Sequence, residues 1–143
     1  MPTPFSKKKP KADEKKLKKD LTDGAKKIKK KDVEELLKKK KDLDEKIKDV
    51  PGRFKKMINQ VKLLFEMIGD YWRKRYTKIP WTSIATAVFA ILYFLSPVDL
   101  IPDFIPVIGY VDDAAVVALA VSFIQEDLKE YCKFKGYRLA QYF

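Results

Sequence analysis

The feature that most constrains this chain is an interval of 50 residues, from 79 to 128, that contains neither Lys nor Arg. Two apolar runs lie within it. The first, IPWTSIATAVFAILYFLSPV (79–98), has 20 consecutive uncharged residues, and the second, AAVVALAVSFIQ (114–125), has 12. About 20 apolar residues are needed to span the ~30 Å hydrocarbon core of a bilayer. The first run therefore predicts a transmembrane helix, whereas the shorter second run leaves a spanning, a re-entrant and an interfacial helix open.

Prolines and charges mark the ends of these runs. Pro80 and Pro97 shorten the first helix, which predicts an apolar helical hairpin from about Thr82 to Ser96 and from Val111 to Lys129. Basic residues return on both flanks, so the positive-inside rule places both termini on the cytoplasmic side. The alternative is that both runs are core helices of a small soluble domain. No strand-like alternation of useful length is present, so we expect an all-α fold.

The positive charge is confined to the first half of the chain. Residues 1–50 carry 19 Lys against 11 Asp or Glu, residues 51–80 carry 8 basic against 2 acidic residues, and residues 81–143 carry 4 against 7. Such a surplus favours an anionic partner, either an acidic bilayer or nucleic acid. Because neither a Gly-rich phosphate loop nor a basic motif with interleaved aromatics accompanies the lysines, nucleic acid is the less favoured of the two.

The first 50 residues predict a basic arm. Residues 1–11 combine three prolines with a lysine cluster and predict a disordered tail, and residues 12–50 predict a Lys-rich helical or partly disordered arm. The helical spacing is interrupted near Lys31 and Asp32, where Asp32 and Glu35 resemble a capping box, and Gly24 weakens the first segment. Pro51 and Gly52 end the arm, so residues 51–143 form the second predicted unit.

From Arg53 to Tyr76 the pattern predicts a basic amphipathic helix with a wide apolar face. Such a helix suits the surface of a membrane, and it equally suits one helix of a soluble bundle. In the membrane interpretation it lies on the cytoplasmic leaflet, before the apolar hairpin. The cations expected to contact anionic lipid are Lys55, Lys56, Lys62, Arg73, Lys74 and Arg75.

The chain has no His and a single Cys, Cys132. This excludes catalytic triads that use His, the usual Cys/His zinc sites, and a disulfide within one chain. With no other catalytic residue pattern in view, we expect a protein that is not an enzyme.

Four aspartates between the two apolar runs are the remaining candidate site: Asp99, Asp103, Asp112 and Asp113. Three interpretations stay open. The carboxylates can cap helix N-termini in a connection restricted by prolines. They can hold a hard cation, Mg²⁺ or Ca²⁺, through oxygen ligands. They can also pair with Arg73, Lys74 and Arg75, or with a second copy of the chain.

The segment SPVDLIPDFIPVIGYVDD resembles the signature of the family catalogued as domain of unknown function 1232, the YkvA-like small membrane proteins. The matching residues are Ser96, Pro97, Asp99, Leu100, Ile101, Pro102, Asp103, Ile105, Pro106, Gly109, Asp112 and Asp113. The resemblance covers about residues 76–128 and does not extend to the first 50. It implies a membrane hairpin, in a bacterial inner membrane, and brings no established biochemical activity.

We therefore expect a small membrane protein that anchors a basic cytoplasmic arm, which interacts with anionic lipid or with a partner protein. Self-association is a further option. One alternative is a soluble all-α module that binds nucleic acid or an acidic partner through its basic half. Another is a protein that binds a divalent cation at the aspartates, and otherwise no cofactor is expected.

Overall fold

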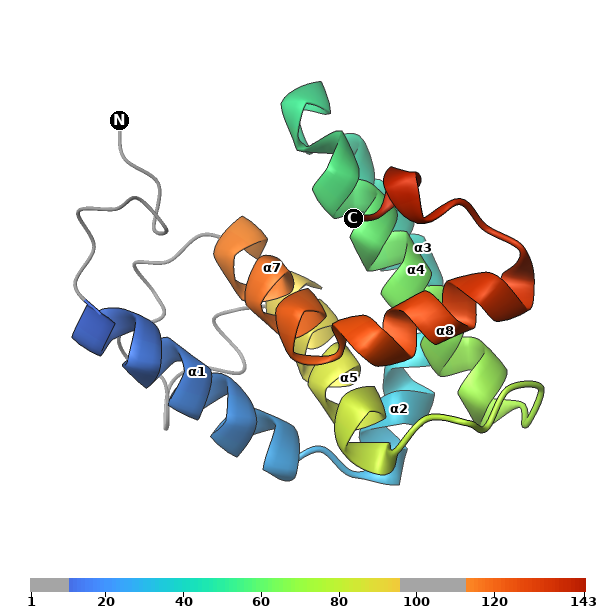
Figure 1. Cartoon of the computed structure of the whole chain (residues 1–143), viewed down its shortest axis with the longest axis horizontal. Coiled ribbons are helices and arrows are strands. Elements are labelled where there is room, and N and C mark those ends of the chain that lie inside the picture. Colours follow the sequence, from blue (N-terminus) through green and yellow to red (C-terminus); the bar gives the residue numbers. More distant parts are fainter. Residues whose placement is uncertain (1–10, 96–112) are drawn as a thin grey trace.

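The structure is a computed structural model that describes residues 11–95 and 113–143 (Figure 1). Within these ranges the chain forms seven α-helices and two short 3-10 helices, without a β-strand, which confirms the predicted all-α class. The elements are α1 (Lys11–Lys26), α2 (Lys30–Leu37), α3 (Lys40–Lys48), η1 (Gly52–Phe54), α4 (Lys55–Trp72), α5 (Trp81–Leu95), α7 (Asp113–Phe123), α8 (Gln125–Lys135) and η3 (Leu139–Gln141).

The centre of the fold is α5, which is apolar on all sides. Residues 83–91 are buried without exception, as expected for a helix that has neighbours around its whole circumference. Helices α1, α4 and α7 all pack against it, and α7 runs back along α5 in the opposite direction (Figure 1). Both apolar runs of the sequence are thus helices that pack together in the protein core.

The predicted transmembrane helix is not confirmed. Helix α5 begins at Trp81, directly after Pro80, and is 15 residues long. At 1.5 Å per residue it measures about 22 Å, which is short of the ~30 Å hydrocarbon core. In the part of the chain that the structure describes, no helix has both the length and the apolar character required to cross a membrane.

Helix α4 corrects the predicted role of the basic amphipathic helix. The middle of its apolar face is buried against α5 and α7, so this part is not free to lie on a leaflet, while Met57, Ile58 and Phe65 are half-buried. The most deeply buried apolar side chains of α4 are Val61, Leu63, Leu64, Met67 and Ile68. The alternative, a helix packed within a bundle, is what the structure shows.

The basic arm is folded onto the rest of the chain. The buried side chains that it contributes belong to the same apolar cluster as α4, α5 and α7. They are Leu21, Ala25, Ile28, Val33, Leu36, Leu43 and Ile47. The chain breaks between α1 and α2 close to the predicted interruption, and the Lys29 N–H donates to the Asp32 carboxylate at 2.7 Å. Asp32 therefore stabilises the first turn of α2 from inside the helix rather than from the position before it.

Gly24 explains how α1 approaches α5 so closely. A Cβ atom at this position would lie 2.5 Å from two ring carbons of Phe89, a buried residue of α5. The glycine predicted to weaken the helix thus removes the atom that would keep the two helices apart.

The second half of the predicted hairpin differs from expectation. In place of one helix from 111 to 129, the chain forms α7 and then α8, with a break at Ile124. After the break α8 turns away from α5 and crosses toward α4 (Figure 1). Its buried residues are Leu128, Tyr131 and Cys132. This change of direction brings the C-terminal part of the chain to α4.

Candidate functional site

Most of the predicted motif lies outside the described residues. This holds for Ser96, Pro97, Asp99, Leu100, Ile101, Pro102, Asp103, Ile105, Pro106, Gly109 and Asp112. Asp113 is the first residue of α7. Among residues 11–95 and 113–143, no group of three or more acidic or Cys side chains is placed to hold a metal ion. The Mg²⁺ or Ca²⁺ interpretation stays a prediction.

All six cations predicted to contact lipid are exposed, but they do not form one patch. Lys62, Arg73 and Arg75 line a common groove. Lys55 and Lys56 lie at the other end of α4, where the Lys56 Nζ donates to the Phe143 carbonyl oxygen at 3.0 Å. Lys74 occupies the turn that ends α4, in a left-handed conformation with φ of 62°.

That turn builds a polar network around Asp70, a residue that the sequence patterns did not single out. The Arg75 N–H donates to the Asp70 carbonyl at 2.8 Å and the Lys74 N–H to the Tyr71 carbonyl at 3.1 Å, so the chain reverses at the end of α4. The reversal directs the Arg75 side chain back to Asp70, whose Oδ1 it contacts through Nε at 3.0 Å and Nη2 at 2.9 Å. Asp70 is only 3% exposed.

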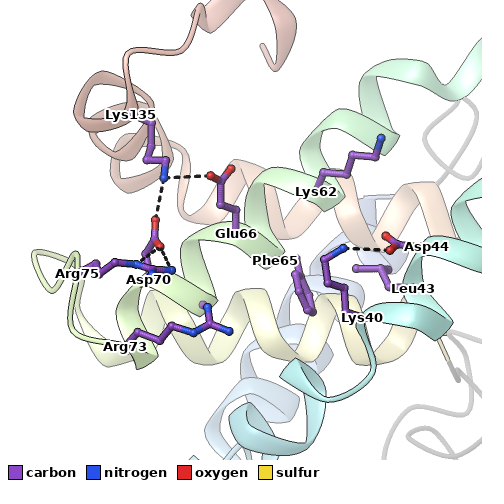
Figure 2. A pocket seen from close by; sticks show the side chains of 11 residues that line it. Lys40, Leu43, Asp44, Lys62, Phe65, Glu66, Asp70, Arg73, Arg75 and Lys135 are labelled. Atoms are coloured by element: carbon purple, nitrogen blue, oxygen red, sulfur yellow. Dashed lines mark hydrogen bonds and ion pairs between the residues drawn. The ribbon is translucent and has the colours of Figure 1, made fainter.

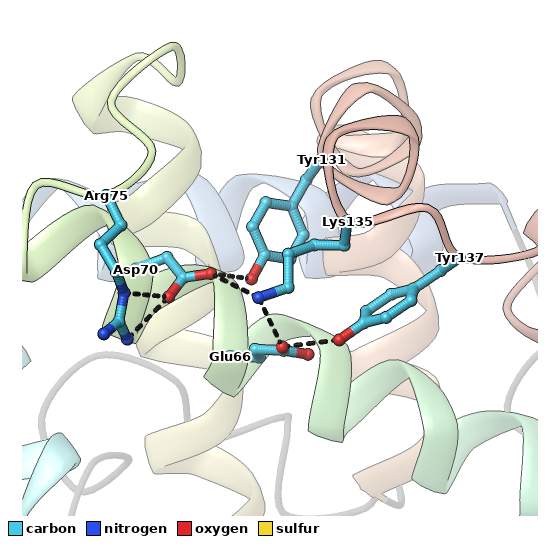
Figure 3. A network of polar contacts seen from close by, with 6 residues as sticks. All are labelled: Glu66, Asp70, Arg75, Tyr131, Lys135 and Tyr137. Carbon is cyan, nitrogen blue, oxygen red and sulfur yellow. Dashed lines mark hydrogen bonds and ion pairs between the residues drawn. The ribbon is translucent and has the colours of Figure 1, made fainter.

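Helix α8 supplies the other partners of Asp70, as Figure 3 shows. The Tyr131 hydroxyl donates to its carboxylate, and the Lys135 Nζ lies 3.3 Å from Oδ2. Lys135 also contacts Glu66 Oε2 at 3.1 Å. Because Glu66 and Asp70 are four residues apart on α4, and Tyr131 and Lys135 four apart on α8, each pair presents both side chains on one helix face.

A second helix end completes the network. Gly136 ends α8 in a left-handed conformation, φ 77°, and the Tyr137 N–H donates to the Cys132 carbonyl at 2.9 Å. This turn places the Tyr137 hydroxyl 2.7 Å from Glu66 Oε2, to which it donates. The turn after α4 thus directs Arg75 to Asp70, and the turn after α8 directs Tyr137 to Glu66.

The network fixes the protonation of its members. Burial opposes ionisation of Asp70, but hydrogen bonds from Tyr131, Arg75 and Lys135 outweigh it and hold the Asp70 pKa below its usual value. Burial and the hydrogen bond to Asp70 raise the pKa of Tyr131, so its phenol stays a donor. The hydrogen bond to Glu66 raises the pKa of Tyr137 to about 12. Paired groups of this kind position α8 on α4 rather than exchange protons near neutral pH.

Beside the network lies a groove of about 550 Å³ between α3, α4 and α8 (Figure 2). Arg75 and Lys135 are paired within the network, and Lys40 pairs with Asp44 at 3.1 Å. Lys62 and Arg73 form no ion pair in the described part of the chain. A Cβ at Gly69 would lie 2.8 Å from Arg73 Nη1, so Gly69 gives the guanidinium room to lie along α4. Lys62 and Arg73 are thus two cations in the lining of the groove that have no ion-pair partner among the described residues.

A scan of the sequence could not find this network, because its two halves lie about sixty residues apart. The sequence contains only weak indications of this network. Glu66 and Asp70 are the only acids between residues 51 and 80, and their spacing of four indicates a shared face. Nothing in the sequence pairs that face with Tyr131 and Lys135.

Comparison with known proteins gives one family. Residues 83–119, which include most of α5 and the first part of α7, match the model of the "Protein of unknown function (DUF1232)" family. The chain is similar to the "Uncharacterized membrane protein YkvA" of Bacillus subtilis (strain 168), with 35% identity over 81 residues that cover 57% of this chain and 76% of that protein. No solved structure matches the chain. With that identity over three quarters of the relative, this chain belongs to the DUF1232 family, as the motif between the two apolar helices predicted.

Proposed function

We propose that this protein is a non-catalytic, membrane-associated protein whose basic helices bind anionic lipid at the cytoplasmic face of a bacterial inner membrane. Its basic arm acts as a fixed surface rather than as a flexible chain. The name of the relative, a membrane protein, supports the location.

The observation that carries this proposal is the packing of α1. Its apolar side chains Leu21 and Ala25 and the following Ile28 are buried, while Lys18, Lys19 and Lys26 are exposed. None of these three lysines forms an ion pair within the described ranges. Lys19 and Lys26 are seven residues apart, about 20° from each other around the helix, so they share one side of α1. Near an anionic membrane, each such cation contributes about 1 kcal/mol.

The six cations of the α4 region have a second role in this proposal. Because the middle of the apolar face of α4 is buried, Lys55, Lys62 and Arg73 act in this proposal through their charge. The groove that holds Lys62 and Arg73 can also bind a soluble anion, but only the lipid proposal uses the whole basic half.

The test is binding of the full chain to vesicles of phosphatidylglycerol and phosphatidylcholine, compared with phosphatidylcholine alone, by sedimentation. Binding is expected only with the anionic lipid, and it should weaken as salt rises. Lys19→Glu with Lys26→Glu should reduce affinity at least tenfold. The matched control is Lys133→Glu with Arg138→Glu, which changes the net charge equally but lies outside the basic half. Equal affinity for both kinds of vesicle, or equal effects of the two double variants, would refute the proposal.

A further inference from the structure

A second groove, of about 440 Å³, lies where the end of α1, the start of α5 and the end of α7 meet. Its walls include Lys26 of α1, Trp81 of α5 and Phe123 of α7. Trp81 is half-buried, and Phe123 is 43% exposed. The groove thus combines two aromatic side chains, which water solvates poorly, with a lysine at the same opening.

Phe123 differs from the other large exposed apolar side chain in the described residues, Phe134. Phe134 is 54% exposed, but its ring packs against Tyr76 and Tyr131, with centroid distances of 4.6 and 6.3 Å. No such ring contact involves Phe123 in the part of the chain that the structure describes. The exposure of Phe134 is therefore explained by internal packing, and that of Phe123 is not.

Most of the hydroxyl groups in this groove are already used within the protein. The Thr22 hydroxyl donates to the Lys18 carbonyl at 2.9 Å, and the Thr86 hydroxyl donates to the Thr82 carbonyl at 2.8 Å. The Ser83 hydroxyl donates to the Asp127 carboxylate at 2.5 Å. Three of the four hydroxyl side chains in the lining are thus engaged. This lining suits an apolar occupant better than a polar small molecule.

The positive charge around the groove indicates which kind of occupant it would bind. Lys26 lines it, and Lys19 lies on the same side of α1 two turns earlier. Indole rings favour the boundary between lipid headgroups and acyl chains, and phenylalanine on a basic surface adds buried apolar area there. A protein partner with an acidic and apolar surface would meet the same groups, but the cations spread along α1 match an extended anionic plane better than a single site.

We propose that this edge, Trp81 and Phe123 flanked by Lys19 and Lys26, is the part of the protein that enters the interface of an anionic bilayer. The inference rests on the proposed function and adds to it the residues that insert. The lysines contact the headgroups, while the two aromatic side chains reach the boundary with the acyl chains. This edge belongs to α1, α5 and α7, and not to α4, where the sequence predicted the membrane-facing helix.

The first experiment measures the affinity of the full chain for vesicles of phosphatidylglycerol and phosphatidylcholine in equal parts. Phe123→Ser should bind about tenfold more weakly, because an inserted phenyl ring is lost. Phe134→Ser, which removes the other exposed phenylalanine, should bind like the parent. Circular dichroism and thermal unfolding confirm that both variants are folded. Equal affinity of Phe123→Ser and the parent would overturn the inference.

The second experiment uses the two tryptophans of the chain. In Trp72→Phe the remaining Trp81 should shift its emission to shorter wavelength on vesicle binding and be quenched by brominated acyl chains. An unshifted, unquenched Trp81 on bound protein would overturn the inference while leaving the proposed function standing. Self-association that Phe123→Ser abolishes, with vesicle affinity unchanged, would overturn it in favour of a second copy. Failure of the parent chain to bind anionic vesicles would instead overturn the proposed function itself.

Discussion

Replacing Gly24 by alanine should destabilise the protein, although helix propensity alone predicts the opposite. Alanine in a helix interior is about 1 kcal/mol more favourable than glycine. In the structure, however, the added Cβ would lie 2.5 Å from two ring carbons of Phe89, which is 1% exposed and cannot swing into solvent. Overpacking of this kind costs about 1–3 kcal/mol. The free energy of unfolding should therefore fall by about 1 kcal/mol net.

Urea unfolding followed by circular dichroism measures this change, and the melting temperature should fall by about 2–4 °C. The matched control is Gly52→Ala, since nothing lies within 4 Å of a Cβ there. That variant should leave stability unchanged or raise it by up to about 1 kcal/mol. Adding Phe89→Leu to Gly24→Ala should cost less than the sum of the two single changes, because the smaller side chain relieves the clash. A Gly24→Ala protein as stable as its parent would refute the close approach of α1 and α5.

Three further outcomes follow from the site. Asp70→Asn should lower the free energy of unfolding by about 3 kcal/mol at neutral pH, because a buried carboxylate loses its charged partners. The folded Asp70 pKa is below its usual 3.8, so the stability that the carboxylate contributes is complete above pH 3.8 and is lost as the pH falls through the folded pKa. The stabilities of parent and variant should converge there, and a constant difference between them would contradict the role of the charged carboxylate. Lys74→Gly should raise stability by up to about 1 kcal/mol by relieving the left-handed conformation, and a loss would argue against that turn. Cys132 is buried with a raised pKa, so thiol reagents should modify it only as fast as the protein opens; rapid modification of the folded protein would show otherwise.

The position of the first apolar helix could be predicted from the sequence. It was expected from about Thr82 to Ser96 and is described from Trp81 to Leu95, because Pro80 fixes its start. The environment of that helix could not be predicted. A helix that is apolar on all sides is expected both in a membrane and in the centre of a protein, since either surrounding removes it from water. The burial of Leu21, Val61 and Ala115 around it shows that other helices of the chain surround it.

Buried polar groups were harder to predict. Asp70 lies among basic residues in the sequence, and its charge indicated an exposed position. It is buried because partners 61 and 65 residues further along the chain reach it from α8. Those contacts depend on the break between α7 and α8 at Ile124. The apolar pattern of the sequence around Ile124 did not predict that one helix ends there and another begins. The cations of the α4 region lie at the surface, whereas the sequence left open whether a bilayer or other helices cover the apolar face of α4.

The docking of α1 determines how its charge can act at a membrane, and Gly24→Ala separates two mechanisms. If α1 stays on α5, Lys26 is held beside Trp81 and Phe123 while Lys19 lies two turns earlier on the same side of α1, and lipid contact uses all four together. A clash at Phe89 that loosens α1 should then weaken binding to anionic vesicles, because ordering the helix again costs conformational entropy. If α1 instead binds as a released amphipathic helix, Leu21, Ala25 and Ile28 become available to the bilayer, and the same substitution should strengthen binding. The vesicle affinity of Gly24→Ala, measured with Gly52→Ala as control, therefore decides whether Leu21, Ala25 and Ile28 stay packed in the protein core or contact the membrane when the protein binds.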